Sequence, residues 1–264
     1  MSTSNELFQR DGYLKFNFDP QLDEWAKWAL PFAQATLTDP RHQQWWRYQK
    51  TWFVGVNVLP NDAHGSVGGG PQLGGAAAEF IRTHLGSNLD DLDAAQISGI
   101  FPGYPKPEVS EKEPGFAYRL QRDAAHVDGL LRLGDEGERY AREFHQYILA
   151  IPLNAVSSSA SPLVLWEGSH QIMRNRLYKL LSGLEFEEQV NRPVNEEYSG
   201  ARKEAFSRCT RVEIPLQLGE ALLLDRHLLH GTAPWQSLDA QDQEGRLIAF
   251  FRPQHGDIAK WLVD

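Results

Sequence analysis

The fold is decided by the stretch Ala221-Leu-Leu-Leu-Asp-Arg-His-Leu-Leu-His-Gly-Thr232, a short apolar run that ends in polar residues. Such a run, bounded by a turn, is typical of a buried strand. Similar runs recur at residues 144–153, 163–166, 210–215 and 246–252. Several connections are too short for helical crossovers, so we expect these strands to pair antiparallel. The sequence therefore predicts a mainly β protein with flanking helices and a double-stranded β-helix (jelly-roll) core.

Helical patterns lie mostly outside this β-rich part. Residues 5–15 and 21–36 are expected to be helical, and the second segment carries an apolar stripe that suits packing against a sheet. Residues 116–121 are expected to form a strand that leads into the following segment. Residues 171–208 are interpreted as a lid-like insertion because their second half is highly charged. With no internal repeat and no clear linker, residues 1–264 are expected to form one domain.

A candidate metal site begins at His126-Val127-Asp128. In an extended segment, side chains at i and i+2 leave the same face, so this imidazole and this carboxylate can bind one cation. His230, brought back by the fold, is the expected third ligand. Two imidazoles and one carboxylate with open positions opposite are typical of non-haem Fe(II) oxygenases.

A candidate anion-binding residue follows on the next strand-like run. Arg246 opens the segment Arg-Leu-Ile-Ala-Phe-Phe251, whose apolar and aromatic content indicates burial. A buried guanidinium needs a partner, and its planar fork suits a carboxylate. The sequence thus predicts that Arg246 pairs with a carboxylate.

Several motifs occur in one order along the chain. They are Phe8-x-x-Asp11-Gly12-Tyr13, His126-x-Asp128, Gly168-Ser169-His170, Leu218-Gly219-Glu220-Ala221, His230-Gly231-Thr232, Ser237 and Arg246. In this order the sequence resembles the phytanoyl-CoA dioxygenase-like family of Fe(II)- and 2-oxoglutarate-dependent oxygenases. The resemblance spans about residues 8 to 253, whereas residues 40–115 match no motif of the family.

The resemblance implies a dioxygenase in which His126, Asp128 and His230 hold Fe(II). The family uses 2-oxoglutarate as cosubstrate and dioxygen as oxidant, and it releases succinate and carbon dioxide as a small-molecule substrate is hydroxylated. Related halogenases replace the carboxylate ligand with a small residue, which lets halide reach the iron. Because Asp128 is present here, hydroxylation is favoured over halogenation.

The resemblance also implies contacts for 2-oxoglutarate. Arg246 would pair with the distal carboxylate, and the hydroxyl of Thr232 or Ser237 would hydrogen-bond to the same group. The segment between His230 and Arg246 is longer than is usual in the family, which we interpret as a lengthened turn at residues 238–245. Arg252, on the same strand face, is the alternative to Arg246.

Other residues near these motifs have competing interpretations. His227 competes with His230 as the distal ligand, but only His230 is followed by Gly-Thr. His145 is more simply a structural histidine. Four aromatic residues could line the substrate pocket, with core packing as the simpler interpretation: Tyr118, Tyr147, Trp166 and Trp235.

An anionic substrate is one option. Arg119 and Gln121 precede the first ligands and could reach the second 2-oxoglutarate carboxylate or a substrate anion, with a surface salt bridge as the equally simple interpretation. Arg122 and Arg132 add positive charge nearby. The net charge of −9 and pI near 5.5 argue against nucleic acid or a membrane as the main partner. A single cysteine and a start without a signal-peptide pattern suggest the cytoplasm.

Two other function classes fit the same residues. The triad could bind Zn²⁺ or Mn²⁺ in a metal-dependent jelly-roll isomerase or hydrolase that ignores 2-oxoglutarate. It could also belong to a non-catalytic module that binds metal and ligand. The sequence indicates neither the substrate nor the oligomeric state.

Overall fold

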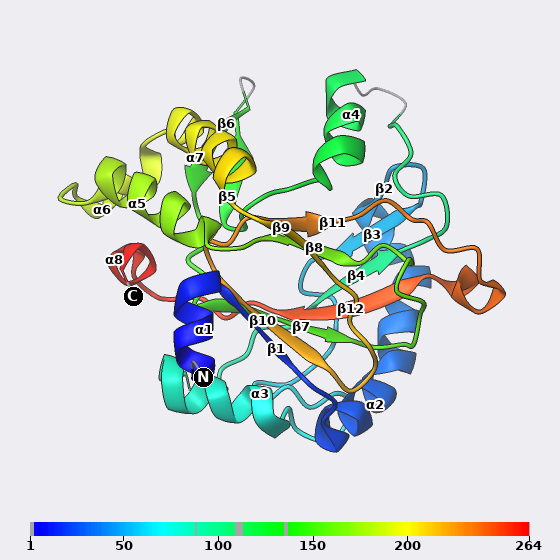
Figure 1. The fold of residues 1–264 in the computed structure, drawn as a ribbon. Helices are drawn as coiled ribbons and strands as arrows, with labels where there is room; N and C mark the ends of the chain where they lie inside the picture. Colours follow the sequence, from blue (N-terminus) through cyan, green and yellow to red (C-terminus); the bar gives the residue numbers. More distant parts are fainter. Residues whose placement is uncertain (1–2, 88, 109–112, 135–136, 264) are drawn as a thin grey trace.

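Two antiparallel sheets stack at the centre of the computed structural model, which describes residues 3–87, 89–108, 113–134 and 137–263 (Figure 1). The larger sheet has the strand order β1-β10-β7-β12-β4-β3-β2, and the smaller has the order β11-β8-β9. A separate hairpin pairs β5 with β6. The strands are β1 (Tyr13–Phe16), β2 (Trp46–Arg47), β3 (Trp52–Gly55), β4 (Gln96–Ile100), β5 (Leu130–Leu133), β6 (Glu138–Ala141), β7 (Tyr147–Pro152), β8 (Leu163–Trp166), β9 (Arg211–Ile214), β10 (Ala221–Asp225), β11 (His230–Thr232) and β12 (Arg246–Phe251).

The alternation of side chains along the central strands explains why their sequences are apolar throughout. In β7, Ile148 and Ala150 point between the two sheets, whereas Leu149 and Ile151 point to the opposite face and meet the helices. The strands β10 and β12 divide their side chains in the same way. Because both faces are covered, these strands lack the hydrophobic-polar alternation that is common in antiparallel sheets. This arrangement confirms the predicted jelly-roll core.

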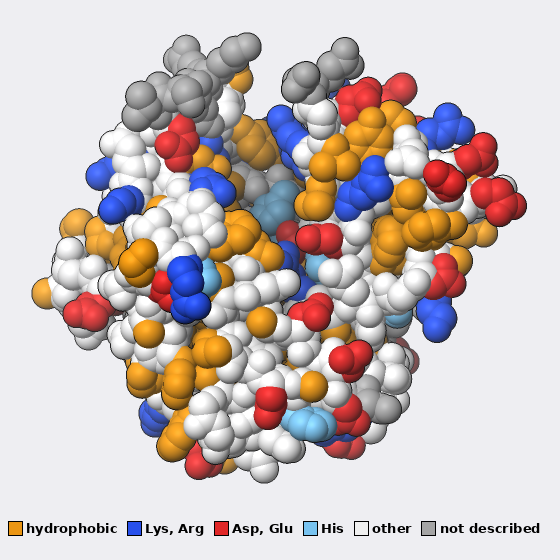
Figure 2. All heavy atoms as spheres, turned by 180° about the vertical axis from the view of Figure 1, so that it is seen from behind, with side chains coloured by type: hydrophobic (Ala, Val, Ile, Leu, Met, Phe, Trp, Pro, Cys, Tyr) orange, Lys and Arg blue, Asp and Glu red, His pale blue; other side chains and the backbone are white. Residues whose placement is uncertain are grey.

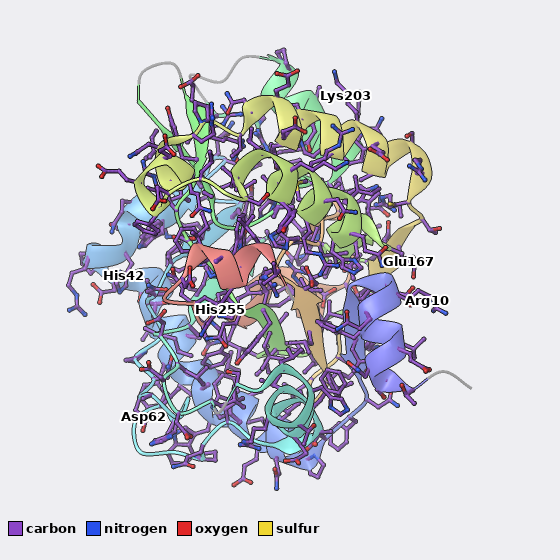
Figure 3. All side chains as sticks on the ribbon, turned by 90° about the vertical axis from the view of Figure 1, so that its left-hand side faces the viewer. Arg10, His42, Asp62, Glu167, Lys203 and His255 are labelled. Carbon is purple, nitrogen blue, oxygen red and sulfur yellow. The ribbon has the colours of Figure 1, made fainter. Side chains whose placement is uncertain are left out.

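Helices cover both outer faces of the sheet pair. The helices are α1 (Ser4–Asp11), α2 (Pro20–Thr38), α3 (Gly75–Phe80), α4 (Glu113–Arg122), α5 (Ser169–Leu181), α6 (Phe186–Asn191), α7 (Asn195–Arg208) and α8 (Ile258–Leu262), with shorter helical turns η1 (Pro40–Trp45), η2 (Ile81–Leu85) and η3 (Ala240–Glu244). The predicted stripe of α2 packs on the larger sheet through Leu22, Trp25 and Ala29. On the other side, α5, α7 and α8 gather over the smaller sheet (Figure 3).

The first predicted helix is shorter than expected, because residues 13–15 belong to a strand. Gly12 ends α1 in the left-handed region with a φ of 81°. A side chain there would meet His170, since an added Cβ would lie 2.4 Å from its Nδ1. Gly12 therefore lets the chain turn sharply into β1, where Tyr13 pairs with Leu224.

The strand expected at residues 116–121 is wrong, because this segment lies in helix α4. The segment was expected to begin the series of strands that follows it, but its contacts with a distant helix favour a helix. Tyr118 and Arg122 are one helical turn apart, and both lie against the ring of Phe206 on α7. After α4 the chain reverses through Asp123 and Ala124, whose φ angles are 53° and 54°.

Residues 195–208 form helix α7, which packs along α5. The side chains of Tyr198, Ala201 and Ala205 are buried at helical spacing, and the charged residues lie on the other side. The strand β4 was not predicted, because residues 40–115 carried no recognisable motif. Within the described ranges, no helix is both long enough and apolar enough to cross a membrane.

Candidate metal centre

His126 and His230 are brought together by backbone pairing. The amide of His126 donates to the carbonyl of His230 at 2.8 Å, and the amide of His230 donates to the carbonyl of His126 at 3.0 Å. This bridge adds the segment around His126 to the edge of β11. The two rings consequently lie side by side, with 4.6 Å between their centroids.

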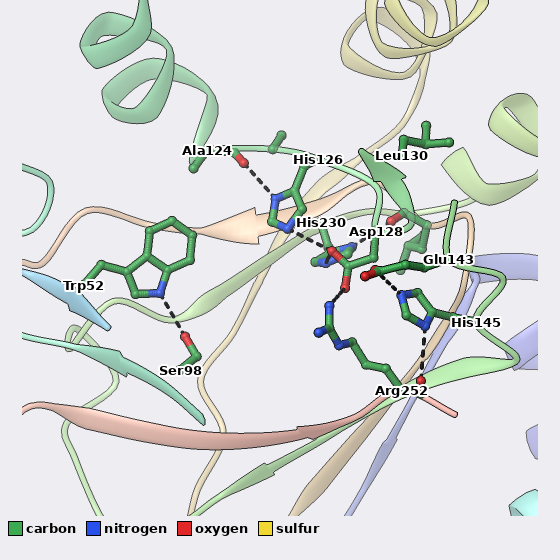
Figure 4. Close-up of polar contacts among 12 residues, drawn as sticks. Trp52, Ser98, Ala124, His126, Asp128, Leu130, Glu143, His145, His230 and Arg252 are labelled. Carbon is green, nitrogen blue, oxygen red and sulfur yellow. Dashed lines mark hydrogen bonds and ion pairs between the residues drawn. The ribbon is translucent and has the colours of Figure 1, made fainter. Parts of the chain in front are cut away.

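Asp128 completes a cluster of three possible ligands (Figure 4). Its Oδ1 lies 3.3 Å from Nε2 of His126 and 3.9 Å from Nε2 of His230. One ligand atom from each of the three residues lies within 4.8 Å of the others. The segment is a turn at Asp128 rather than the regular strand expected, yet the side chains of His126 and Asp128 still point to the same place.

The backbone fixes which nitrogen of each imidazole is free. Nδ1 of His126 lies 2.9 Å from the carbonyl oxygen of Ala124, and Nδ1 of His230 lies 2.9 Å from that of Leu228. A carbonyl oxygen can only accept, so each Nδ1 must carry the proton. The Nε2 lone pairs then face Asp128. A histidine that binds a metal through Nε2 requires this tautomer, with the proton on Nδ1.

The charges of the cluster also favour a cation. Burial lowers the pKa of His230 to about 4, so this imidazole is neutral at physiological pH. Burial alone would raise the pKa of Asp128, but Arg252 and the two imidazoles outweigh it and hold the pKa well below its usual value. Arg252 donates to Oδ2 of Asp128 at 3.1 Å, which leaves Oδ1 facing the imidazoles. The arrangement offers one negative charge at Asp128 and a neutral nitrogen donor at His230, whereas Asp128 outweighs the effect of burial and raises the pKa of His126.

The other two histidines considered from the sequence lie outside this cluster. His227 is buried against the ring of Trp261, and neither of its nitrogens has a hydrogen-bond partner among the described residues. His145 lies 3.1 Å from the carboxylate of Glu143 and 3.1 Å from the carbonyl oxygen of Arg252. It therefore supports the strand that carries Arg252, as a structural residue.

The cluster opens into a cavity that also contains Arg246 and Thr232. The cavity is lined by Trp52, Gln96, Ser98, Ala124, His126, Asp128, Leu163, His230, Gly231, Thr232, Arg246 and Phe250. The space-filling view shows this part of the molecule as a hollow with a histidine side chain in it (Figure 2). A small molecule in the cavity could therefore touch the three clustered residues and Arg246 together.

Arg246 is a buried cation without a counter-ion. It is only 5% exposed, and its guanidinium donates to the Thr232 hydroxyl at 3.2 Å. Its Nε has no hydrogen-bond partner, and no described carboxylate forms an ion pair with it. Burial lowers the pKa of Arg246 to about 10. Such a group has its most favourable partner in an anion supplied from outside the chain.

Three of the residues proposed to bind the cosubstrate are placed elsewhere. Ser237 does not line the cavity, because its hydroxyl bonds to Asp242 and Ser157 and holds the turn before β12. Gln121 is exposed on α4. Arg252 is engaged with Asp128, so it is not a substitute for Arg246.

The cavity contains residues that the sequence did not single out. Trp52 of β3 and Ser98 of β4 line it and bond to each other, with 3.0 Å between the indole nitrogen and the hydroxyl oxygen. The only signal was a polar residue inside the apolar run 96–101. The four aromatic candidates for the pocket wall do not line this cavity: Tyr118, Tyr147, Trp166 and Trp235.

Comparisons with known proteins show the fold. The sequence matches no protein-family model and no curated protein. Among solved structures, the chain is similar to the non-heme alpha ketoglutarate dependent carbocyclase SnoK from nogalamycin biosynthesis, with a TM-score of 0.57 and 12% identity over 97% of this chain and 85% of that one. It is also similar to the non-heme alpha ketoglutarate dependent epimerase SnoN from nogalamycin biosynthesis. The TM-score is 0.50, and the identity is 15% over 94% of this chain and 80% of that one. The resemblance to the phytanoyl-CoA dioxygenase-like family itself stays a prediction.

Proposed function

We propose that this protein is a non-haem iron dioxygenase that uses 2-oxoglutarate to hydroxylate a small molecule. The observation that carries the proposal is Arg246, a buried guanidinium without a counter-ion among the described residues, in the same cavity as a His-Asp-His cluster. 2-Oxoglutarate has a carboxylate at one end for Arg246, and at the other end a keto acid that can chelate a metal. A metal-dependent isomerase or hydrolase that ignores 2-oxoglutarate would have to supply another anion for this arginine.

The residues of the cluster suit Fe(II). His126, Asp128 and His230 would hold the ion, because two neutral imidazole nitrogens and one carboxylate oxygen form the donor set of non-haem Fe(II) oxygenases. When bound, iron and 2-oxoglutarate supply an oxidant from dioxygen, with release of succinate and carbon dioxide. The carboxylate of Asp128 occupies the place that a halide would need, which supports hydroxylation over halogenation.

The other residues of the cavity bind, orient and exclude water. Arg246 and Thr232 would hold the distal carboxylate of 2-oxoglutarate; the Thr232 hydroxyl already donates to the carbonyl oxygen of Ser161 at 3.1 Å and accepts from Arg246. Arg252 holds Oδ2 of Asp128, so that Oδ1 keeps its direction. Apolar side chains of Leu163 and Phe250 in the wall keep water from the reacting atoms.

The proposal is tested by the release of labelled carbon dioxide from 2-oxoglutarate that carries the label at its first carbon. Purified protein with Fe(II) and oxygen should release the label slowly even without substrate, and Asp128→Ala should not. Release that is equal in Asp128→Ala, or absent from the wild type although metal binds, would contradict the proposal. In the second case a metal-dependent isomerase or hydrolase becomes the better description.

A further inference from the structure

A second cavity lies between the hairpin β5–β6 and helix α7, and it is strongly basic. Three arginines line it, namely Arg132, Arg139 and Arg202, together with Tyr198 and the polar side chains of Asn195 and Ser199. None of the three arginines forms an ion pair with a described carboxylate. Three cations around one cavity repel one another unless an anion is present.

The polar groups of this cavity have unused capacity to donate. The Tyr198 side chain is 1% exposed, and its hydroxyl has no hydrogen-bond partner in the described part of the chain. The Nε of Arg202 is also buried and unpartnered. Burial and the repulsion from Arg132 and Arg202 lower the pKa of Arg139. Unpaired buried donors of this kind are costly, so they indicate a missing acceptor.

The aromatic rings keep two of the arginines in place. The guanidinium carbon of Arg139 lies 4.9 Å from the centroid of the Tyr198 ring, and that of Arg202 lies 4.6 Å from it. Arg139 also donates to the carbonyl oxygen of Leu130 at 2.9 Å. Because these contacts fix the guanidinium groups before any ligand arrives, less entropy is lost when an anion binds.

Hydrogen bonds link the basic cavity to the segment that carries the candidate metal centre. Arg202 donates to the Tyr118 hydroxyl at 2.8 Å, and this hydroxyl donates to the carbonyl oxygen of Ala125 at 2.7 Å, next to His126. Leu130, which Arg139 holds, lies two residues after Asp128. Figure 2 shows Lys and Arg side chains beside the hollow. The basic cavity therefore lies beside the segment 125–130, which carries two of the three clustered residues.

We propose that Arg132, Arg139 and Arg202 bind a phosphate group of the substrate, so that the enzyme acts on a phosphorylated small molecule. This inference rests on the proposed function, since it assigns the substrate of that site. Three guanidinium groups with hydroxyl and amide donors suit a tetrahedral dianion, whereas a carboxylate would offer two oxygens and one charge. Of the arginines near the first ligands that suggested an anion from the sequence, only Arg132 lines this cavity.

The experiment uses methyl phosphate as the probe and acetate as the planar comparison. Both are titrated calorimetrically into the full chain, with Fe(II) and saturating 2-oxoglutarate under anaerobic conditions, so that Arg246 is occupied. Methyl phosphate should bind saturably and more tightly than acetate. Arg139→Gln should weaken its binding about tenfold or more, because a hydrogen bond to a charged group is lost.

Two further variants separate binding from folding. Arg132 is exposed, and its side chain has no hydrogen bond or ion pair with another described residue, so Arg132→Gln should weaken binding without disturbing the fold. Lys203→Gln is the control, because Lys203 is exposed on the same helix as Arg202 and points outward (Figure 3). Binding should be unchanged in this variant.

Three outcomes of the binding experiment would overturn the inference. The first is no saturable binding of methyl phosphate to the wild type, and the second is equal binding in Arg132→Gln and Arg139→Gln. The third is acetate binding as tightly as methyl phosphate, which would exclude a site that is specific for a phosphate group. Carbon dioxide release by the same wild-type sample in oxygen tests the proposed function separately. Phosphate binding without any release would overturn the substrate role while the basic cavity remained an anion site.

Discussion

Replacing Arg246 with methionine should separate the stability of the protein from its affinity for 2-oxoglutarate. Burial lowers the pKa of Arg246 to about 10, and each pKa unit is worth about 1.4 kcal/mol, so the charged form costs on the order of 3 kcal/mol. Methionine removes this cost and keeps the apolar stem, although the hydrogen bond to Thr232 is lost, at about 1.5–3 kcal/mol. Without ligand, Arg246→Met should therefore be no less stable than the wild type.

The affinity for 2-oxoglutarate should change in the opposite direction. Loss of one partner of a buried charge pair costs roughly 2–5 kcal/mol, which is about 30-fold to several thousand-fold in Kd. The assay is urea unfolding with anaerobic Fe(II), with and without 2-oxoglutarate. Ligand at about 100 times Kd should stabilise the wild type by about 2.7 kcal/mol and should leave Arg246→Met almost unchanged.

Arg192→Met is the control, because Arg192 is exposed after α6 and lies outside the cavity. Its variant should keep the full stabilisation by 2-oxoglutarate. If 2-oxoglutarate stabilised Arg246→Met as much as the wild type, the arginine would not bind the cosubstrate. If the ligand-free variant were less stable by several kcal/mol, Arg246 would have a structural role instead.

Three other changes have defined outcomes. Arg252→Gln should weaken Fe(II) binding about 10- to 100-fold in a metal titration, because the partner of Asp128 is lost; unchanged metal affinity would contradict this role. Gly231→Ala should lower the free energy of unfolding and the metal affinity, because the added Cβ would lie 2.1 Å from the carbonyl oxygen of Asp123. Normal metal binding by this variant would contradict the prediction, because the backbone would then have moved to accommodate the Cβ. Burial lowers the pKa of His227 to about 3, well below its unfolded value near 6.5. The stability that the neutral imidazole contributes is therefore complete above about pH 6.5. It falls by about 1.4 kcal/mol per pH unit as the pH drops toward 3. His227→Gln should flatten this slope in urea unfolding between pH 7 and 5, and parallel slopes would refute it.

The strands and the three clustered residues could be anticipated because their signals are local. Apolar runs such as residues 221–224 identify strands, and the spacing in His126-x-Asp128 places two side chains together whether the segment is a strand or a turn. The convergence of His230 on them depends on a backbone bridge between distant segments. The family resemblance supplied that pairing, since periodicity carries no information about it.

The missed features depend on packing between distant residues. Helix α4 was expected to be a strand, and its contacts with Phe206, 84 to 88 residues further along the chain, cannot be read from the local sequence. Ser237 matched the spacing of a cosubstrate hydroxyl, but the neighbouring Asp242 binds it. The basic cavity joins Arg132 and Arg139 of the hairpin to Arg202 of α7, and no sequence motif links these elements.

The most direct measurement is an anaerobic titration of the protein with Fe(II) and then 2-oxoglutarate, followed by visible absorption. We expect a weak metal-to-ligand charge-transfer band when 2-oxoglutarate is added to the wild type. The band should be absent in Asp128→Ala, which lacks the carboxylate ligand, and should require much more 2-oxoglutarate in Arg246→Met. A wild-type spectrum that shows bound Fe(II) but does not change with 2-oxoglutarate would contradict the proposed function.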